Sequence, residues 1–403
     1  MKNSPTAAYI HIPFCLRRCY YCDFAISVVG DKPIENDSVM ISDYVYSLCQ
    51  EIKSIPRQIS KPLKTIFFGG GTPSLLPQAQ LAKILKMLDS HLQIASDAEI
   101  SIEIDPGTFD LNKLQGYLNL GINRFSLGVQ SFEPELLKIC GRTHGLADIY
   151  AAIDLIRQAQ IKNFSLDLIT GLPHQTLEHC QKSLLQAIEI APAHLSCYDL
   201  VLEPTTAFGK QYQPGTKPLP EDETTAQMYR LTQQLLTGAD YEHYEISNYA
   251  QNSHQYQCRH NRVYWQNQSY YGFGMSAASY FQRKRFNRPR TRKAYYEWVK
   301  QGSLIDAEEI SQNDYLLETL MLGLRLSEGI ALQELSQKFG DQTTNKIVNS
   351  LAKFICQGLI KIDHESEVAL ANASQKEARI KLTDPSGFLL SNTVLASLFN
   401  TFS

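Results

Sequence analysis

Runs of apolar residues with the alternation typical of β-strands recur through the first half of the chain, and an amphipathic helical pattern follows each of them. The six runs are AYIHIP, KTIFFGG, EISIEIDP, RFSLGVQSF, NFSLDLITGLP and HLSCYDLVL. Strands that alternate with helices form a parallel sheet with right-handed crossovers. Six units are too few for a closed eight-fold barrel, so the pattern predicts an open, partial (β/α)6 TIM-like barrel of the α/β class.

The alternation stops after about residue 203. A loop rich in Pro, Gly and Thr comes first, then a helical stretch and a segment crowded with aromatic residues, and from about residue 305 a series of short helices. We expect a core over residues 1–300, with an extension over about 205–300. Residues 301–403 are expected to form a small C-terminal domain, helical and winged-helix-like.

Composition narrows the class of protein without identifying it. The chain has 43% hydrophobic and 20% charged residues and a net charge of −3, which offers no electrostatic case for binding nucleic acid. No run of about 18 apolar residues predicts a membrane-spanning helix. The N-terminal residues lack the apolar core of a signal peptide, so we expect a cytoplasmic protein.

Three of the nine cysteines form a distinct group. Cys49, Cys140, Cys180, Cys197, Cys258 and Cys356 are scattered singly and are expected to behave mostly as small buried hydrophobic residues. In contrast, Cys15, Cys19 and Cys22 share one loop directly after the first strand. Structural zinc takes four ligands, usually in two separated pairs, whereas a 4Fe–4S cluster held by three thiolates keeps one iron open to another ligand. The loop therefore favours an iron–sulfur cluster.

The spacing Cys-x3-Cys-x2-Cys, with Tyr21 before the last cysteine, resembles the radical S-adenosylmethionine (SAM) superfamily. The resemblance implies that the open iron binds the amino and carboxylate groups of SAM. It also implies that an electron from the cluster cleaves SAM to a 5′-deoxyadenosyl radical. Cys15, Cys19 and Cys22 are the cluster ligands on this reading.

Polar residues at the C-terminal ends of the predicted strands fit the same cofactor, because this is the rim where barrel-like folds build their sites. Two carboxylates, an amide and a guanidinium suit a ligand with an ammonium, a carboxylate and ribose hydroxyls. The porphyrin branch of the superfamily carries SAM contacts at matching positions, with Ile169 as an apolar wall for adenine and Tyr9 and His11 on the strand that leads to the cluster. The resemblance implies SAM contacts at Tyr9, Tyr21, Gly70, Gly71, Thr72, Glu103, Gln130, Arg142, Asp167 and Ile169.

The motifs YIHIPFC, GGGTPS, GVQSF and DLITGLP together resemble the coproporphyrinogen III oxidase-like group. Two subfamilies compete. One is the oxygen-independent coproporphyrinogen III dehydrogenase, which carries a further cysteine two residues after the third cluster cysteine. The other is the HemW-type heme chaperone. Phe24 stands at that position here, and the short N-terminal lead also favours the chaperone.

The stretch HNRVYW resembles the HNxxYW motif of the chaperones, and it implies heme contacts at His260, Tyr264 and Trp265. A neutral imidazole is a competent axial ligand of heme iron, and Cys258 and His254 are alternatives. We therefore expect a carrier that binds heme and delivers it to heme proteins, such as membrane respiratory enzymes, with any membrane contact peripheral. A porphyrinogen-oxidising enzyme is the alternative. Whether the chain forms a homodimer stays open.

Overall fold

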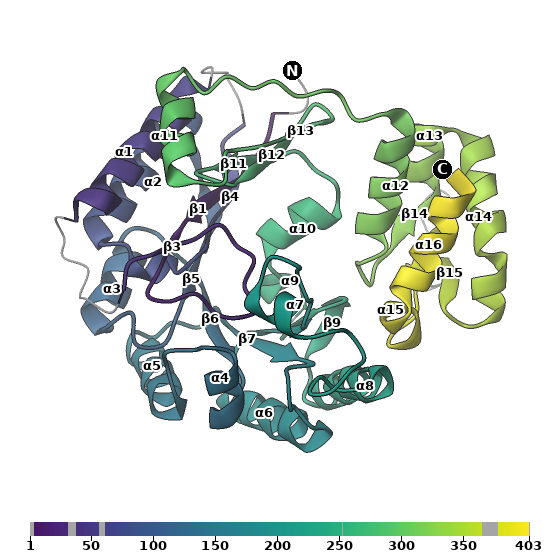
Figure 1. Cartoon of the computed structure of the whole chain (residues 1–403). Helices are drawn as coiled ribbons and strands as arrows, with labels where there is room; N and C mark the ends of the chain where they lie inside the picture. Colours follow the sequence, from purple (N-terminus) through teal and green to yellow (C-terminus); the bar gives the residue numbers. More distant parts are fainter. Residues whose placement is uncertain (1–3, 31–37, 56–60, 252, 365–377, 403) are drawn as a thin grey trace.

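A computed structural model describes residues 4–30, 38–55, 61–251, 253–364 and 378–402. Six parallel strands form its centre and confirm the predicted open barrel (Figure 1). In spatial order they are β1 (Ala7–Ile12), β4 (Leu63–Gly70), β5 (Ile94–Ile104), β6 (Arg124–Gln130), β7 (Phe164–Thr170) and β8 (His194–Asp199).

Helices cover the outer face of this sheet (Figure 1). Each helix turns an apolar stripe toward the sheet. The helix Gln78–Leu92, for example, buries Leu81, Leu85 and Leu88, which are spaced by about one helical turn. The helices of this layer are α1 (Val39–Ser54), α2 (Gln78–Leu92), α3 (Leu111–Asn119), α4 (Pro134–Ile139), α5 (Leu146–Gln158), α6 (Leu177–Ile190) and α8 (Asp222–Gly238). The inner face of the sheet is left for polar side chains and for the segments after residue 250.

Three short strands from the aromatic-rich segment extend the sheet beyond the six that the pattern predicts. β11 (Tyr271–Phe273) adds parallel to β1, whereas β10 (Asn248–Ala250) and β9 (Glu242–Glu245) add antiparallel beyond β8. At Gly272 a Cβ atom would lie 1.9 Å from the carbonyl oxygen of Ala278, so only glycine allows this strand to pack under the hairpin β12 (Ala278–Phe281)–β13 (Lys284–Asn287).

A buried ion pair ties this extension to the first helix of the core. The Arg288 guanidinium lies 2.7 Å from the Glu51 carboxylate, which also accepts hydrogen bonds from the Tyr295 hydroxyl at 2.7 Å and the Gly274 N–H at 2.8 Å. Tyr295 belongs to α11 (Arg292–Lys300). Both charges are almost fully buried, and such a pair is stable only when further hydrogen bonds complete it, as they do here.

The C-terminal part has its own hydrophobic core, built from residues such as Leu320, Ile347 and Phe388. It combines helices with a small antiparallel sheet in the order β14-β16-β15, in keeping with the predicted winged-helix-like unit. Its elements are α12 (Gln312–Gly323), β14 (Ile330–Ala331), α13 (Leu332–Phe339), α14 (Asp341–Cys356), β15 (Ile360–His364), β16 (Ala378–Leu382), α15 (Ser386–Leu389) and α16 (Ser391–Phe402).

Short elements complete the chain: β2 (Phe14–Cys15), β3 (Ser27–Val28), the 3-10 turn η1 (Pro73–Leu75), α7 (Ala207–Gln211), α9 (Ser253–Tyr256) and α10 (Arg259–Trp265). In Figure 1, α10 lies between the core and the C-terminal part. Across the described ranges, none of the helices has the length and apolar character that crossing a membrane requires.

Candidate functional site

A cavity of about 560 Å³ opens at the C-terminal ends of the parallel strands, under the cysteine loop. Of the thirteen residues expected to bind the cluster or SAM, all but Tyr9 line it. These are Cys15, Cys19, Tyr21, Cys22, Gly70, Gly71, Thr72, Glu103, Gln130, Arg142, Asp167 and Ile169. The fold therefore brings residues that lie between Cys15 and Ile169 in the sequence together around one cavity.

The cysteine loop is held in a compact turn by its own backbone and by Arg18. The Cys22 N–H donates to the Cys19 carbonyl at 3.2 Å, and the Arg18 guanidinium donates to the carbonyls of Cys22 and Phe24, both at 3.2 Å. The Tyr20 N–H donates to a carbonyl at the end of α4. Arg18 thus shapes the loop through backbone contacts.

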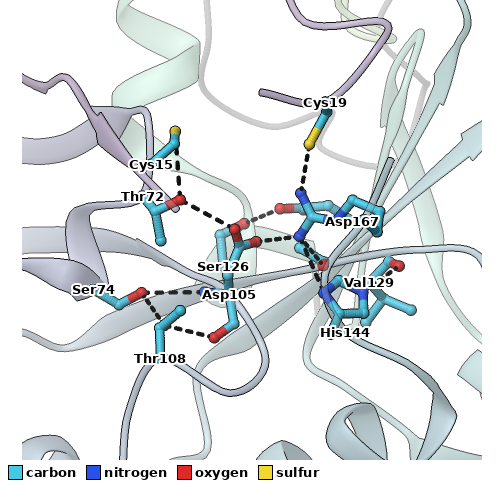
Figure 2. A network of polar contacts seen from close by, with 12 residues as sticks. Cys15, Cys19, Thr72, Ser74, Asp105, Thr108, Ser126, Val129, His144 and Asp167 are labelled. Carbon is cyan, nitrogen blue, oxygen red and sulfur yellow. Dashed lines mark hydrogen bonds and ion pairs between the residues drawn. The ribbon is translucent and has the colours of Figure 1, made fainter. Parts of the chain in front are cut away.

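Two side chains of the barrel reach toward the thiols (Figure 2). The Thr72 hydroxyl lies 3.7 Å from the Cys15 sulfur, and a guanidinium nitrogen of Arg142 lies 3.5 Å from the Cys19 sulfur. Burial raises the pKa of the Cys15 thiol to about 12, so without a metal it stays protonated. A bound cluster would supply the positive charge that stabilises thiolates, and the cation of Arg142 acts in the same direction.

The donor set fits a cluster better than a single ion. No group of three or more His, Cys, Asp or Glu side chains among the described residues converges on one metal position. A 4Fe–4S cube places each thiolate on a different iron, and so it calls for sulfur atoms spread around a space. Cys15, Cys19 and Cys22 meet this need, because they line the same cavity.

The glycines at the end of β4 allow the strand to approach the cluster loop. A Cβ atom on Gly71 would lie 2.7 Å from the Phe14 carbonyl oxygen and 3.0 Å from the Cys15 sulfur. Gly70 has a φ of +114°, and a Cβ atom there would lie 2.5 Å from the His11 ring. Both positions therefore require glycine for close packing around the site, which goes beyond an ordinary tight turn.

Asp105 belongs to the same polar network, although the sequence motifs did not indicate it. Its carboxylate lies 2.5 Å from the Arg142 guanidinium and accepts a hydrogen bond from the Thr72 hydroxyl at 3.1 Å. Figure 2 shows Asp105 between Thr72 and the guanidinium, held from below through Ser74 and Thr108. The sequence did contain a signal for Asp105: side chains alternate between the two faces of a strand, so Asp105 is expected on the same face as Glu103, two residues earlier.

Two further carboxylates lie deeper in the cavity. Burial and the nearby Asp167 raise the pKa of Glu103 to about 8, although the Gly70 N–H donates to it at 3.0 Å. Burial also raises the pKa of Asp167, which accepts hydrogen bonds from the hydroxyls of Ser126 at 2.8 Å and Ser165 at 3.2 Å. Two carboxylates in one low-dielectric space favour a positively charged ligand, because it would stabilise their ionised forms.

A β-bulge directs Gln130 into the cavity. The register of β6 against β7 shifts between Gly128 and Gln130, and Gln130 has a φ of 67°, in the left-handed region. Such a backbone is uncommon for a residue with a side chain and occurs where a site requires it. In contrast, Tyr9 is set back from the cavity, with its hydroxyl 3.1 Å from the His11 ring nitrogen.

The helix α10, which carries HNRVYW, closes the floor of the barrel. The Glu99 carboxylate accepts the backbone N–H groups of Arg259 at 3.1 Å and His260 at 3.0 Å, which fixes the start of the helix. Cys258 and Asn261 line the cavity floor beside it. The motif thus belongs to the wall of the site.

The three predicted heme contacts in this motif face different surroundings. His260 is buried, with one ring nitrogen 2.9 Å from the Thr65 hydroxyl and the other 2.8 Å from the Tyr264 hydroxyl. Burial lowers the pKa of His260 to about 3, so the ring is neutral, yet both nitrogens are already engaged. Trp265 instead lies under the Arg325 guanidinium, 4.3 Å from its ring centroid. The alternative His254 lies outside the described side chains.

Phe24 stands at the mouth of the cavity and is 59% exposed. Val201, which is 65% exposed, and Tyr198 also line this cavity and are exposed. Exposed apolar side chains thus contribute to the lining of the cavity.

Comparison with known proteins agrees with this geometry. Residues 9–187 match the model of the radical SAM superfamily, and residues 310–366 match the HemN C-terminal domain. The chain is 50% identical to the Synechocystis heme chaperone HemW over 98% of its own length and 96% of that protein. It is 34% identical to the Bacillus subtilis heme chaperone HemW, with 90% and 94% covered.

A solved structure shares the fold. Coproporphyrinogen III oxidase (HemN) from Escherichia coli, described as a radical SAM enzyme, superposes with a TM-score of 0.79 at 25% identity. The match covers 98% of this chain and 90% of that one, so it includes the C-terminal part.

Proposed function

The chain belongs to the HemW family of the radical SAM superfamily, and from this membership we propose that it is a heme chaperone. On this proposal it binds a 4Fe–4S cluster, SAM and heme, and delivers the heme to heme proteins. The observation that carries the choice is Phe24 at the cavity mouth, where the resemblance gives the dehydrogenase a further cysteine. The full-length similarity to heme chaperones supports the same choice.

Cys15, Cys19 and Cys22 are the proposed ligands of the cluster, which when bound supplies an electron to SAM. Arg142 stabilises the thiolate of Cys19, and Thr72 lies against Cys15. Both side chains also hold Asp105. The cluster loop and the SAM cavity are therefore joined by one polar network.

The proposed SAM contacts follow from charge and position. Glu103 and Asp167 suit the positive groups of SAM and its ribose hydroxyls, and the bulged Gln130 adds an amide. Ile169 packs with other apolar side chains into a wall suited to an adenine ring. The full proposed set is Tyr9, Tyr21, Gly70, Gly71, Thr72, Glu103, Gln130, Arg142, Asp167 and Ile169.

The proposed heme contacts are His260, Tyr264 and Trp265, and they do not carry equal weight. The indole N–H of Trp265 is buried, and no acceptor among the described residues reaches it. In contrast, His260 would have to give up a hydrogen bond before it could bind iron. We therefore place Trp265 first among the three.

The remaining proposals concern organisation and surroundings. We assign residues 1–300 to the core and 301–403 to the C-terminal domain, since separate hydrophobic cores support a division in this region. Heme-accepting proteins are the proposed partners, with membrane respiratory enzymes as the first candidates. The protein would then act in the cytoplasm, with membrane contact through a partner, as a monomer or a homodimer.

One experiment separates the chaperone from the alternative, an oxygen-independent coproporphyrinogen III dehydrogenase, which the shared fold with HemN also allows. The cluster-reconstituted protein is incubated anaerobically with SAM, a reductant and coproporphyrinogen III, and the same sample is titrated with heme. We expect stoichiometric heme binding and no protoporphyrinogen. Repeated turnover to protoporphyrinogen would make the protein the dehydrogenase.

A further inference from the structure

A second cavity, of about 920 Å³, lies between the core and the C-terminal part. Its walls come from the turn after α10, the β12–β13 hairpin, α12, α13 and β16. Within the described part of the chain, it shares no lining residue with the SAM cavity, which is the cavity under the cysteine loop. We call it the interdomain cleft.

The two cavities differ in the residues that line them. Sites for small-molecule ligands span about 300–1,000 Å³, and the interdomain cleft lies in this range. The SAM cavity would be occupied by the cluster and SAM. Among the described residues that line the interdomain cleft, none is a proposed cluster or SAM contact.

The charge of the cleft suits an anion. Four basic side chains line it against two acidic ones. Both acidic side chains are already paired: Glu328 accepts two hydrogen bonds of 2.9 Å from Arg262, and Glu334 lies 2.6 Å from Lys338. The basic residues are Lys61, Arg283, Lys338 and Arg379, but Lys338 pairs with Glu334 and Arg283 lies 3.4 Å from Glu309. Among the described residues, Lys61 and Arg379 are therefore the cations of the cleft without a carboxylate partner, and two such charges match a ligand with two carboxylates.

Aromatic rings of the cleft suit a flat, apolar ligand. Trp265, Tyr280 and Tyr315 all line it, and they come from three different elements. Arg325 lies over Trp265 at 4.3 Å, and Arg283 lies over Tyr315 at 5.1 Å. Cation–π contacts of this kind hold rings in place. The indole nitrogen of Trp265 is buried, so this side chain offers the cleft the apolar part of its ring.

We propose that the interdomain cleft is where this protein holds heme, with the macrocycle against Trp265 and its propionates among the basic side chains. The inference rests on the proposed function and, of its three heme contacts, keeps Trp265, because His260 and Tyr264 do not line the cleft. No His, Cys or Met is among the described residues that line the cleft, so it offers the heme iron at most a tyrosine oxygen, from Tyr280 or Tyr315. A heme held there keeps at least one axial position of its iron open to a ligand from the accepting protein.

The test compares two double variants of the full chain in heme titrations followed by Soret absorbance. Lys61→Gln with Arg379→Gln removes the two cations of the cleft that have no carboxylate partner; because Arg379 also donates to the Glu328 and Gly329 carbonyls, the unfolding transition of the variant is measured alongside. Lys86→Gln with Lys182→Gln removes two charges from the exposed surfaces of α2 and α6, outside the cleft, and is the matched control. We expect about a tenfold rise in the dissociation constant for the cleft variant and none for the control. With heme dimethyl ester, which lacks the propionate charges, the two variants should bind alike.

Each outcome has one meaning. Equal heme affinity of the cleft variant and the control would overturn the cleft as the heme site while leaving the chaperone proposal in place. Failure of the wild-type protein to bind heme at all would overturn the proposed function and the inference with it. The spectrum gives a second check: we expect high-spin ferric heme that added imidazole converts to low spin, and a low-spin spectrum without imidazole would contradict the open iron.

Discussion

Glutamine in place of Glu103 is expected to stabilise the protein without ligands and to weaken its binding of SAM. Glu103 is a carboxylate with a raised pKa, about 8 instead of its ordinary 4.5. The charged groups that shift the pKa of Glu103 are the carboxylates of Asp167 and Asp105, and both raise it. Glutamine keeps the size of the side chain and an oxygen that accepts the Gly70 N–H.

The sign of the pH dependence follows from the raised pKa. Between pH 4.5 and about 8 the folded protein holds the Glu103 proton more tightly than the unfolded chain does, so stability falls as pH rises through this window and levels off above it. The difference between a pKa of 4.5 and one of about 8 corresponds to at most about 5 kcal/mol in the free energy of unfolding. Glu103 lines an open cavity and is only partly buried, so solvent screens part of its charge and we expect about 2 kcal/mol at pH 9.

Urea unfolding of the apo protein between pH 5 and pH 9 measures this effect. The stability gained by Glu103→Gln over the wild type should grow up to pH 8 and then stay constant. Glu135→Gln, an exposed change on α4, is the control for loss of one negative charge. In the reconstituted protein, SAM affinity should fall about tenfold or more, because a charge-assisted hydrogen bond is lost. Parallel pH profiles for the wild type and Glu103→Gln would refute the reasoning.

Three further substitutions test other parts of the site. Gly71→Ala places a methyl group against the Cys15 sulfur and should leave less than half of the wild-type iron and sulfide after anaerobic reconstitution; full content would contradict the close packing. Cys19→Ser should lose the 4Fe–4S cluster but keep heme binding, and a retained cluster would remove Cys19 from the ligand set. His260→Ala breaks two buried hydrogen bonds, one of them to Tyr264, and should lower the free energy of unfolding by about 3 kcal/mol. If it also abolished heme binding in a folded protein, His260 would return as the iron ligand.

Local patterns predicted the centre of the fold well. Each of the six apolar runs became a parallel strand, because alternation and the following helix are local signals of that structure. The strand Tyr271–Phe273 was missed, since three residues carry little pattern and only the distant β1 gives them a partner. Pairing between segments so far apart is decided by packing, which no local window contains.

The site was predicted unevenly for the same kind of reason. Cysteine spacing and glycine runs are visible in a sequence, and those residues do line one cavity. Asp105 needed the position of Arg142, which lies in the loop between α4 and α5, and the bulge at Gln130 depends on how β6 pairs with β7. The hydrogen-bond partners of His260 could not all be predicted either, because Thr65 lies almost 200 residues away in the sequence.

The helix α10 connects the two cavities. Asn261 lies on the floor of the SAM cavity, and Trp265, four residues later and about 6 Å along the helix axis, lies on the wall of the interdomain cleft. Arg262, between them, pairs with Glu328 of the C-terminal part. We expect a helix this short to move as one body, so that a ligand that shifts it in one cavity changes the wall of the other. Heme and SAM should therefore alter each other's affinity by the same factor. The measurement is a titration with each ligand, with and without a saturating amount of the other. Equal affinities with and without the second ligand would mean that α10 is only a wall between them.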